Sequence, residues 1–225
     1  ATGSGIFING TSRTNTLVNN TVGSTQSSKI VIDDISSGKN YLLYNNLFGS
    51  MLWNKTNLTT NVTLKMGTSI FLENNLVGLL DIPGLENLNS TAQIEIKNLN
   101  FLNTPWLMKA GVRCDNTILC NVSYDSATGT LTANVSSFSN YSARDGTAPT
   151  VNITAPTNGS NFSFRSRLQD FNATVLDETN VSVVIFQFAN GTTSFNRTAT
   201  NSSGTWNVSG FNTSTLAEGT RLVTV

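Results

Sequence analysis

Short runs of alternating apolar and polar residues recur along the chain, and this period-two pattern is typical of half-buried β-strands. Residues 171–175 (Phe-Asn-Ala-Thr-Val) and 206–209 (Trp-Asn-Val-Ser) show it in its simplest form. The runs are rich in Val, Ile, Thr and aromatic residues, and they are bounded by Gly, Asn, Asp and Ser. No segment keeps an apolar period of 3.6 residues. The pattern therefore predicts an all-β fold.

The spacing of the runs predicts two tandem β-sandwich domains. In the first, at residues 29–147, strands are expected at 29–33, 61–66, 69–73, 92–98, 107–113, 119–124, 130–136 and 141–143. A linker is expected at 145–149, because Pro149 restrains Ala148 to an extended conformation. In the second, at residues 148–225, strands are expected at 150–154, 171–176, 181–188, 192–200, 205–211 and 220–225.

The first 28 residues differ from the rest. They are rich in Gly, Ser, Thr and Asn around two short apolar pieces, which are too sparse to build a core of their own. We therefore expect residues 1–28 to form an extended N-terminal arm. The chain starts at Ala1, without a Met or a basic segment before an apolar one, so we expect a processed product that has lost its targeting peptide.

Few charges and no histidine narrow the range of functions. The 13 Lys+Arg balance 13 Asp+Glu, so the net charge gives no attraction for nucleic acid or an anionic membrane. Catalysis by a Ser-His-Asp triad, a Cys-His pair or an HExxH zinc site is excluded, because all three need histidine. The most apolar stretch, residues 76–85, is too short for a membrane span and contains Asp81 and Pro83.

Asparagine, serine and threonine take the place of the missing charges, and their order is not random. Nineteen asparagines head an Asn-x-Ser/Thr sequence in which x is not proline, the acceptor motif (sequon) of N-glycosylation, whereas random placement would give about eight. From Pro149 onward, all ten asparagines head such a motif. The predicted acceptors are Asn9, Asn19, Asn54, Asn57, Asn61, Asn89, Asn121, Asn134, Asn140, Asn152, Asn158, Asn161, Asn172, Asn180, Asn190, Asn196, Asn201, Asn207 and Asn212.

Ten of the sequons also carry an apolar middle residue. Successive side chains of a strand point to opposite faces, so the Asn and the Ser or Thr would face water while the middle residue enters the core. N-glycosylation takes place outside the cytoplasm, which predicts an extracellular or cell-surface glycoprotein. The ten middle residues are Leu58, Val62, Val122, Val135, Tyr141, Ile153, Phe162, Ala173, Val181 and Val208.

The two cysteines are predicted to form a disulfide. Cys114 and Cys120 close a short loop between two expected strands, a spacing compatible with a disulfide across a hairpin end. Zinc is excluded as the alternative, because two thiols without histidine leave the tetrahedral coordination incomplete. A disulfide agrees with an extracellular location.

Carboxylates are the remaining candidates for chemistry. Asp33-Asp34, Asp145 and Asp177-Glu178 lie near expected strand ends or the linker, where acidic clusters can hold calcium. No calcium-loop motif is present, so solvated turn residues are the favoured interpretation. Spacing alone leaves a two-carboxylate glycosidase open. A glycan-covered sandwich leaves little room for a cleft, and we expect no enzyme, no metal site and no cofactor.

Several motifs of the second domain point to a family. Four segments resemble the immunoglobulin-like (Ig-like) repeats of secreted archaeal and bacterial surface proteins: residues 145–156 (DGTAPTVNITAP), 173–177 (ATVLD), 204–210 (GTWNVSG) and 216–220 (LAEGT). The resemblance covers residues 145–225 and implies an Ig-like β-sandwich. Residues 29–144, through the cysteine pair and the segment 138–143 (FSNYSA), resemble a β-domain found beside such repeats.

In one respect the second domain departs from the family pattern. Such repeats normally close with a seventh strand, whereas the last expected strand, at 220–225, has no partner after it. Pilus subunits fill such an open edge by strand donation from the next copy. Ile6, Phe7 and Ile8 suit a donor strand, with residues 17–22 as the second choice. Head-to-tail donation would give a homopolymer.

The sequence therefore predicts a structural subunit of an extracellular, densely N-glycosylated filament or pilus-like appendage. Two alternatives stay open. The chain could be a fragment of a longer tandem-repeat surface protein. It could also be a cell-surface adhesin or carbohydrate-binding module, in which Trp53, Trp106 and Trp206 would form a platform for stacking sugars.

Overall fold

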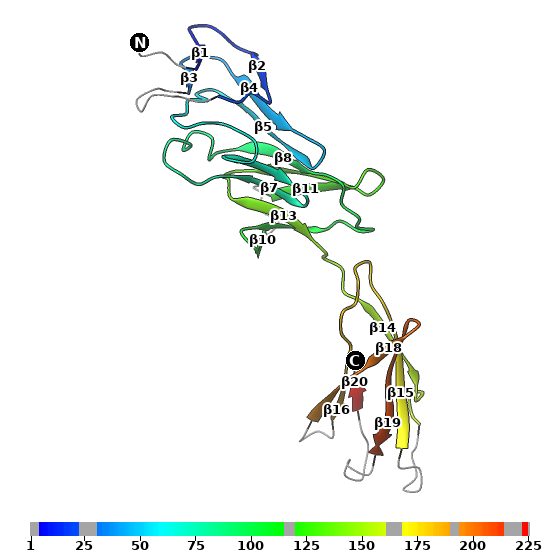
Figure 1. Cartoon of the computed structure of the whole chain (residues 1–225). Coiled ribbons are helices and arrows are strands. Elements are labelled where there is room, and N and C mark those ends of the chain that lie inside the picture. Colours follow the sequence, from blue (N-terminus) through cyan, green and yellow to red (C-terminus); the bar gives the residue numbers. More distant parts are fainter. Residues whose placement is uncertain are drawn as a thin grey trace. The chain divides into compact units, whose positions relative to one another are not determined.

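A computed structural model describes residues 5–22, 31–114, 120–160, 168–189, 194–213 and 222–224. The fold is all-β, as predicted, and divides into two compact units, Ala1–Gly146 and Thr147–Val225 (Figure 1). In these residues no helix is long and apolar enough to cross a membrane.

The first unit contains a six-stranded sheet and a five-stranded sheet around one core. Buried side chains from both sheets, among them Trp53, Ile94, Leu107 and Tyr141, belong to a single hydrophobic cluster, which makes the unit a β-sandwich. The six-stranded sheet has the order β11 (Cys120–Asp125), β12 (Thr130–Val135), β8 (Ala92–Ile96), β5 (Gly49–Lys55), β4 (Asn40–Asn45) and β2 (Thr16–Val18). The five-stranded sheet has the order β10 (Val112–Arg113), β9 (Trp106–Lys109), β13 (Asn140–Arg144), β7 (Leu76–Leu79) and β6 (Ile70–Glu73).

The N-terminal segment is not a free arm, and this expectation was wrong. Strand β1 (Ile6–Ile8) pairs in parallel with β3 (Ile32–Asp34), and β2 pairs in parallel with β4. Ile8 and Val22 are 7% exposed. The apolar residues of the segment are too few for a core of their own, but they complete the core of the first unit.

A buried polar network helps to hold this segment in place. The Asp34 carboxylate is 3% exposed and accepts hydrogen bonds from Ser36, from the side-chain amide of Asn40 and from the Leu58 N–H. The side-chain oxygen of Asn40 in turn accepts from the backbone and side-chain nitrogens of Asn15, at 3.0 and 2.9 Å. The segment is thus joined to the first unit by hydrogen bonds as well as by apolar packing.

Three strands in the middle of the first unit, β4, β5 and β7, were missed from the sequence. In β4, Asn40, Leu42 and Tyr44 are buried, but the outward residues Tyr41 and Leu43 are also apolar. The apolar outward residues hide the period of two on which strand prediction depends. Residues 61–66 were expected to form a strand but make only two isolated bridges, from Leu64 to Val22 and from Met66 to Ile70.

The described residues of the second unit form an Ig-like sandwich with seven strands. One sheet has the order β14 (Thr150–Ala155), β15 (Leu168–Leu176), β19 (Thr205–Asn212) and β18 (Thr200–Ser202). The other has the order β17 (Ser194–Thr198), β16 (Ile185–Ala189) and β20 (Leu222–Thr224). Figure 1 shows the two groups of strands on opposite sides of this unit. A cluster containing Phe171, Phe186, Phe188, Trp206 and Phe211 fills the space between them.

The strand order bears on the expected gap in this sandwich. The run at 192–200 contributes one strand to each sheet, so six expected runs become seven strands. The four-stranded sheet has the order of strands A, B, E and D of an Ig domain, which makes β16 strand C and β20 strand F. Among the described residues, β20 pairs only with β16. No described strand takes the position of strand G, beside β20.

Candidate glycan-acceptor surface

The sequon asparagines lie at the surface. Seventeen of the nineteen are described, and fifteen of these are exposed, whereas Asn172 and Asn207 are half-buried. Asn161 and Asn190 lie outside the described residues. The structure therefore leaves every described acceptor at least partly accessible, which is the steric condition for adding a glycan.

The apolar middle residues point the other way. Five of them are buried and four are half-buried, while Phe162 lies outside the described residues. Strand alternation explains this arrangement within the strands. Asn57 reaches it differently, because its positive φ of 58° turns the chain at Leu58, which is fully buried. The buried residues are Leu58, Val135, Tyr141, Ala173 and Val208, and the half-buried ones are Val62, Val122, Ile153 and Val181.

The strand register brings two pairs of sequons face to face. Asn121 of β11 lies opposite Asn134 of β12, and Asn172 of β15 lies opposite Asn207 of β19. Side chains of directly opposed residues share one face of a sheet, with Cβ atoms about 4.5 to 5.5 Å apart. The two asparagines of each pair lie on different strands, so motif spacing alone did not reveal the pairs.

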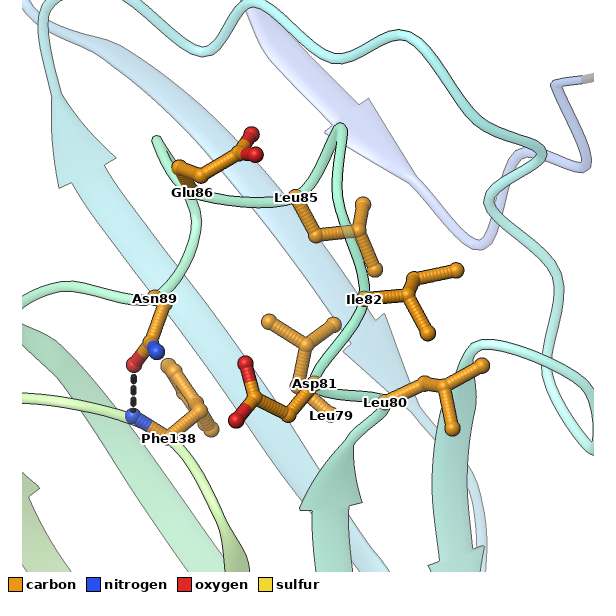
Figure 2. Close-up of a pocket in the computed structure, with 8 residues that line it drawn as sticks. All are labelled: Leu79, Leu80, Asp81, Ile82, Leu85, Glu86, Asn89 and Phe138. Carbon is orange, nitrogen blue, oxygen red and sulfur yellow. Dashed lines mark hydrogen bonds between the residues drawn. The ribbon is translucent and has the colours of Figure 1, made fainter.

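Asn89 borders a small pocket in the first unit (Figure 2). Its side-chain oxygen accepts a hydrogen bond from the Phe138 N–H at 2.6 Å. The pocket has a volume of about 130 Å³ and is lined by Leu79, Leu80, Asp81, Ile82, Leu85, Glu86, Asn89 and Phe138. Ligand sites for small molecules usually enclose about 300 to 1,000 Å³, so this pocket is too small for a substrate of that class.

Two acidic residues hold turns in the first unit. The Gly84 N–H donates to both carboxylate oxygens of Glu86 at 2.9 Å and lowers the pKa of that residue. The Thr128 hydroxyl and the Ala127 N–H donate to Asp125 and lower the pKa of its carboxyl in the same way. Both carboxylates therefore have structural hydrogen bonds.

Several acidic residues considered for calcium accept hydrogen bonds from the protein itself. Asp34 is enclosed in the polar network at the start of the first unit. The Asp177 carboxylate accepts from the Glu178 N–H, and Glu178 accepts from the Thr147 hydroxyl at 2.6 Å. Within the described ranges, no three His, Cys, Asp or Glu residues are grouped so that they could hold a metal ion.

Cys114 and Cys120 form a disulfide, with Cα atoms 6.1 Å apart. The spacing predicted a hairpin, but the strands on either side of the disulfide are not the two arms of one. Cys114 follows β10, at the edge of the five-stranded sheet, whereas Cys120 begins β11, at the edge of the six-stranded sheet. The disulfide therefore connects the two sheets of the sandwich.

The three tryptophans do not form a common platform for sugar. Trp53 is fully buried and its ring N–H donates to the Leu88 carbonyl at 2.9 Å. Trp206 is 7% exposed in the core of the second unit. Trp106 is half-buried, and the Arg113 guanidinium lies 4.2 Å from the centre of its ring. Two of the three rings are thus core residues.

Comparison with known proteins supports the Ig-like part of the resemblance. Residues 149–225 match the family model of the bacterial Ig domain. No curated protein and no solved structure matches the chain. Bacterial Ig domains are typically non-enzymatic structural modules and commonly occur in extracellular or surface proteins. The second unit is therefore similar to a surface-protein module.

Proposed function

We propose that this chain is a structural segment of an extracellular surface protein, and that N-linked glycans cover its sheet faces and loops. The observation that carries the proposal is the common orientation of the sequons. Every described acceptor is at least partly exposed, and every described apolar middle residue is buried or half-buried. The number of motifs supports the same conclusion, because nineteen sequons stand where random placement would give about eight.

Such a coat would supply what the protein surface itself lacks. With a net charge of zero and only 12% charged residues, the chain has little charge repulsion to keep it dissolved. Sugars bind water without charge and shield the backbone beneath them. The two sandwiches would provide the mechanical scaffold, and the glycans would provide solubility, bulk and protection. Neither role needs a catalytic residue or a cofactor.

Glycopeptide mapping tests the proposal. The full chain, secreted from a host that performs N-glycosylation, should carry glycans on several of the nineteen acceptors. Asn103 provides an internal control, because it is exposed but heads Asn-Thr-Pro, which is not a sequon. Bare asparagine at all nineteen positions would overturn the proposal, and modification of Asn103 would show that the sequon is not the signal.

Head-to-tail assembly is a second candidate, favoured by one observation in each unit. In the second unit, β20 pairs with β16 and with no other strand among the described residues, and strand addition uses a sheet edge of this kind. In the first unit, β1 is only three residues long, and among the described residues it pairs with β3 alone. A β1 that left β3 could pair with β20 of the next copy, as in domain swapping.

A reversible crosslink tests this assembly. Phe7 and Asp33 are opposed residues of β1 and β3, so Phe7→Cys with Asp33→Cys should lock β1 in its own chain. If β1 is the donor, fibres seen by electron microscopy should be absent from the oxidised variant and return after reduction. Wild-type protein treated with the same reductant controls for loss of the Cys114–Cys120 disulfide. Fibres from the oxidised variant would rule out donation of β1.

A further inference from the structure

One outward sheet face of the first unit is apolar. Val18 of β2 lies opposite Leu43 of β4, and Leu43 lies opposite Leu52 of β5. Tyr41, two residues before Leu43, points to the same side. We call these four residues the apolar face. Val18 is 45% exposed, and the other three are half-buried.

This face needs an explanation, because the same side of the sheet is polar on the neighbouring strands. Leu52 lies opposite Gln93 of β8, and Gln93 lies opposite Asn134 of β12. On β8 the charged Glu95 pairs with Lys97 at 2.9 Å. The apolar face is therefore an uncharged surface at one end of a polar sheet, and a partner for it should be uncharged as well.

A sequon stands at the border of the apolar face. Asn54 of β5 is exposed and lies directly opposite Tyr41 of β4. The next residue, Lys55, is held on the other side of the strand, where its ammonium donates to the Asn87 carbonyl and, at 2.9 Å, to the Ser90 hydroxyl. Asn54 is therefore presented beside the Tyr41 ring, with Cβ atoms about 4.5 to 5.5 Å apart.

The chemistry of a glycan matches this surface. One side of a pyranose ring presents C–H groups that pack on aromatic and aliphatic side chains, while its hydroxyls stay in water. The row formed by Leu43 and Leu52 lies about 7 Å further along the strands than the row formed by Tyr41 and Asn54. The first sugars on Asn54 can therefore reach both rows.

We propose that the N-linked glycan of Asn54 lies down on the apolar face, with its first sugar against Tyr41 and the next toward Leu43, Leu52 and Val18. The glycan is then part of the fold of the first unit. This inference rests on the proposed function, since it requires that Asn54 be glycosylated. It adds a specific contact surface and a contribution to stability.

A pair of substitutions at the third residue of the sequon isolates the glycan. Thr56→Ala removes the acceptor motif, whereas Thr56→Ser keeps it. The Thr56 side chain is exposed, so neither substitution disturbs the core. Relative to Thr56→Ser, Thr56→Ala should lower the thermal midpoint of the first unit by about 2 to 4 °C. It should also increase the fluorescence of a dye that binds exposed apolar surface.

The same comparison in a Tyr41→Ala background tests the contact itself. The difference between Thr56→Ala and Thr56→Ser should shrink to less than half, because the glycan no longer has the ring to pack against. Asn134→Gln is the matched control, since Asn134 lies on the same sheet face but opposite Gln93 and Asn121, neither of which is aromatic. Its midpoint should change by less than about 1 °C.

Glycopeptide mapping of the same samples separates the two proposals. Bare asparagine at every sequon overturns the proposed function. Glycans elsewhere with Asn54 bare overturn this inference and leave the proposed function standing. An occupied Asn54 with an equal midpoint difference in the Tyr41 and Tyr41→Ala backgrounds also overturns the inference. Coupling to Tyr41 together with the dye response is the result that supports it.

Discussion

Asn172 and Asn207 face each other across β15 and β19, and the side-chain amide of Asn207 donates a hydrogen bond to the side-chain oxygen of Asn172. Ser209 is the third residue of the Asn207 sequon, and its hydroxyl donates a hydrogen bond to the side-chain oxygen of Asn207. Asn172 and Asn207 are the two half-buried acceptors among the described sequons. Two predicted modification sites thus share one small area of the sheet.

We predict that Asn172 and Asn207 are not both glycosylated in one molecule. Their Cβ atoms are about 4.5 to 5.5 Å apart, which leaves room for one sugar ring above the pair. Quantitative glycopeptide mapping should give occupancies that sum to no more than one per chain. Asn172→Gln should raise the occupancy of Asn207, whereas Asn196→Gln, at a site opposite Gln187, should not. Full occupancy at both sites would contradict the prediction.

Removing the buried carboxylate of Asp34 should destabilise the first unit strongly. Asp34→Ala leaves the backbone N–H groups of Ser36 and Leu58 without their acceptor in a site that is 3% exposed. We expect a loss of about 3 to 5 kcal/mol in the free energy of unfolding. Urea unfolding of the full chain measures it. Asp81→Ala, at an exposed position, should change the value by less than about 0.5 kcal/mol.

Substitutions at Gly129 and Gly111 distinguish two energetic costs of adding a side chain, which are backbone strain and steric collision. Both have positive φ, 62° and 79°, but a Cβ on Gly129 would collide with the Leu99 carbonyl, whereas a Cβ on Gly111 would meet no atom within 4 Å. Gly111→Ala should cost about 1 kcal/mol from backbone strain alone. Gly129→Ala should cost about 2 to 4 kcal/mol. Equal losses in urea unfolding would show that the collision relaxes without cost.

High pH should destabilise the first unit through two buried tyrosines. Burial raises the pKa of Tyr44 and that of Tyr141 to about 12, from the ordinary value of 10.0. The unfolded chain therefore loses these protons at lower pH than the folded chain, and stability present below pH 10 is lost as the pH rises toward 12.

The pH dependence of urea unfolding checks this prediction. Tyr44→Phe should remove about half of the decline between pH 10 and pH 12, because a phenyl ring has no proton to lose. The substitution also removes the hydrogen bond from the Tyr44 hydroxyl to the Asn20 carbonyl. The decline of each protein is therefore measured relative to its own free energy of unfolding at pH 7. An unchanged decline in the variant would contradict the assignment.

Phe171→Ala should unfold the second unit at lower temperature. Phe171 is 1% exposed and makes edge contacts with Phe188 and Phe211, whose rings stack on each other at 4.3 Å. The cavity should cost about 3 to 5 kcal/mol. Calorimetry should show the transition of the second unit shifted and that of the first unit unchanged, since the phenylalanine cluster lies wholly in the second unit. A shift of both transitions would contradict this separation.

Sequence reasoning succeeded where the relevant information is local. The runs that became β8, β12 and β14 have apolar residues at alternate positions only, and their type was predicted correctly. It failed at β4 and β5, where Tyr41, Leu43 and Leu52 add apolar residues to the outward face. It also failed for Ile6 and Val22, because sparse apolar residues can join a core built elsewhere in the chain.

The amino-acid sequence by itself determined the all-β class, the acceptor motifs and the inward direction of their apolar middle residues. Each depends on the next one or two residues and on the alternation of a strand. Only the tertiary structure decided which acceptors become neighbours. The pairing of Asn172 with Asn207 and of Asn54 with Tyr41 depends on strand register, which long-range packing sets and local sequence does not encode.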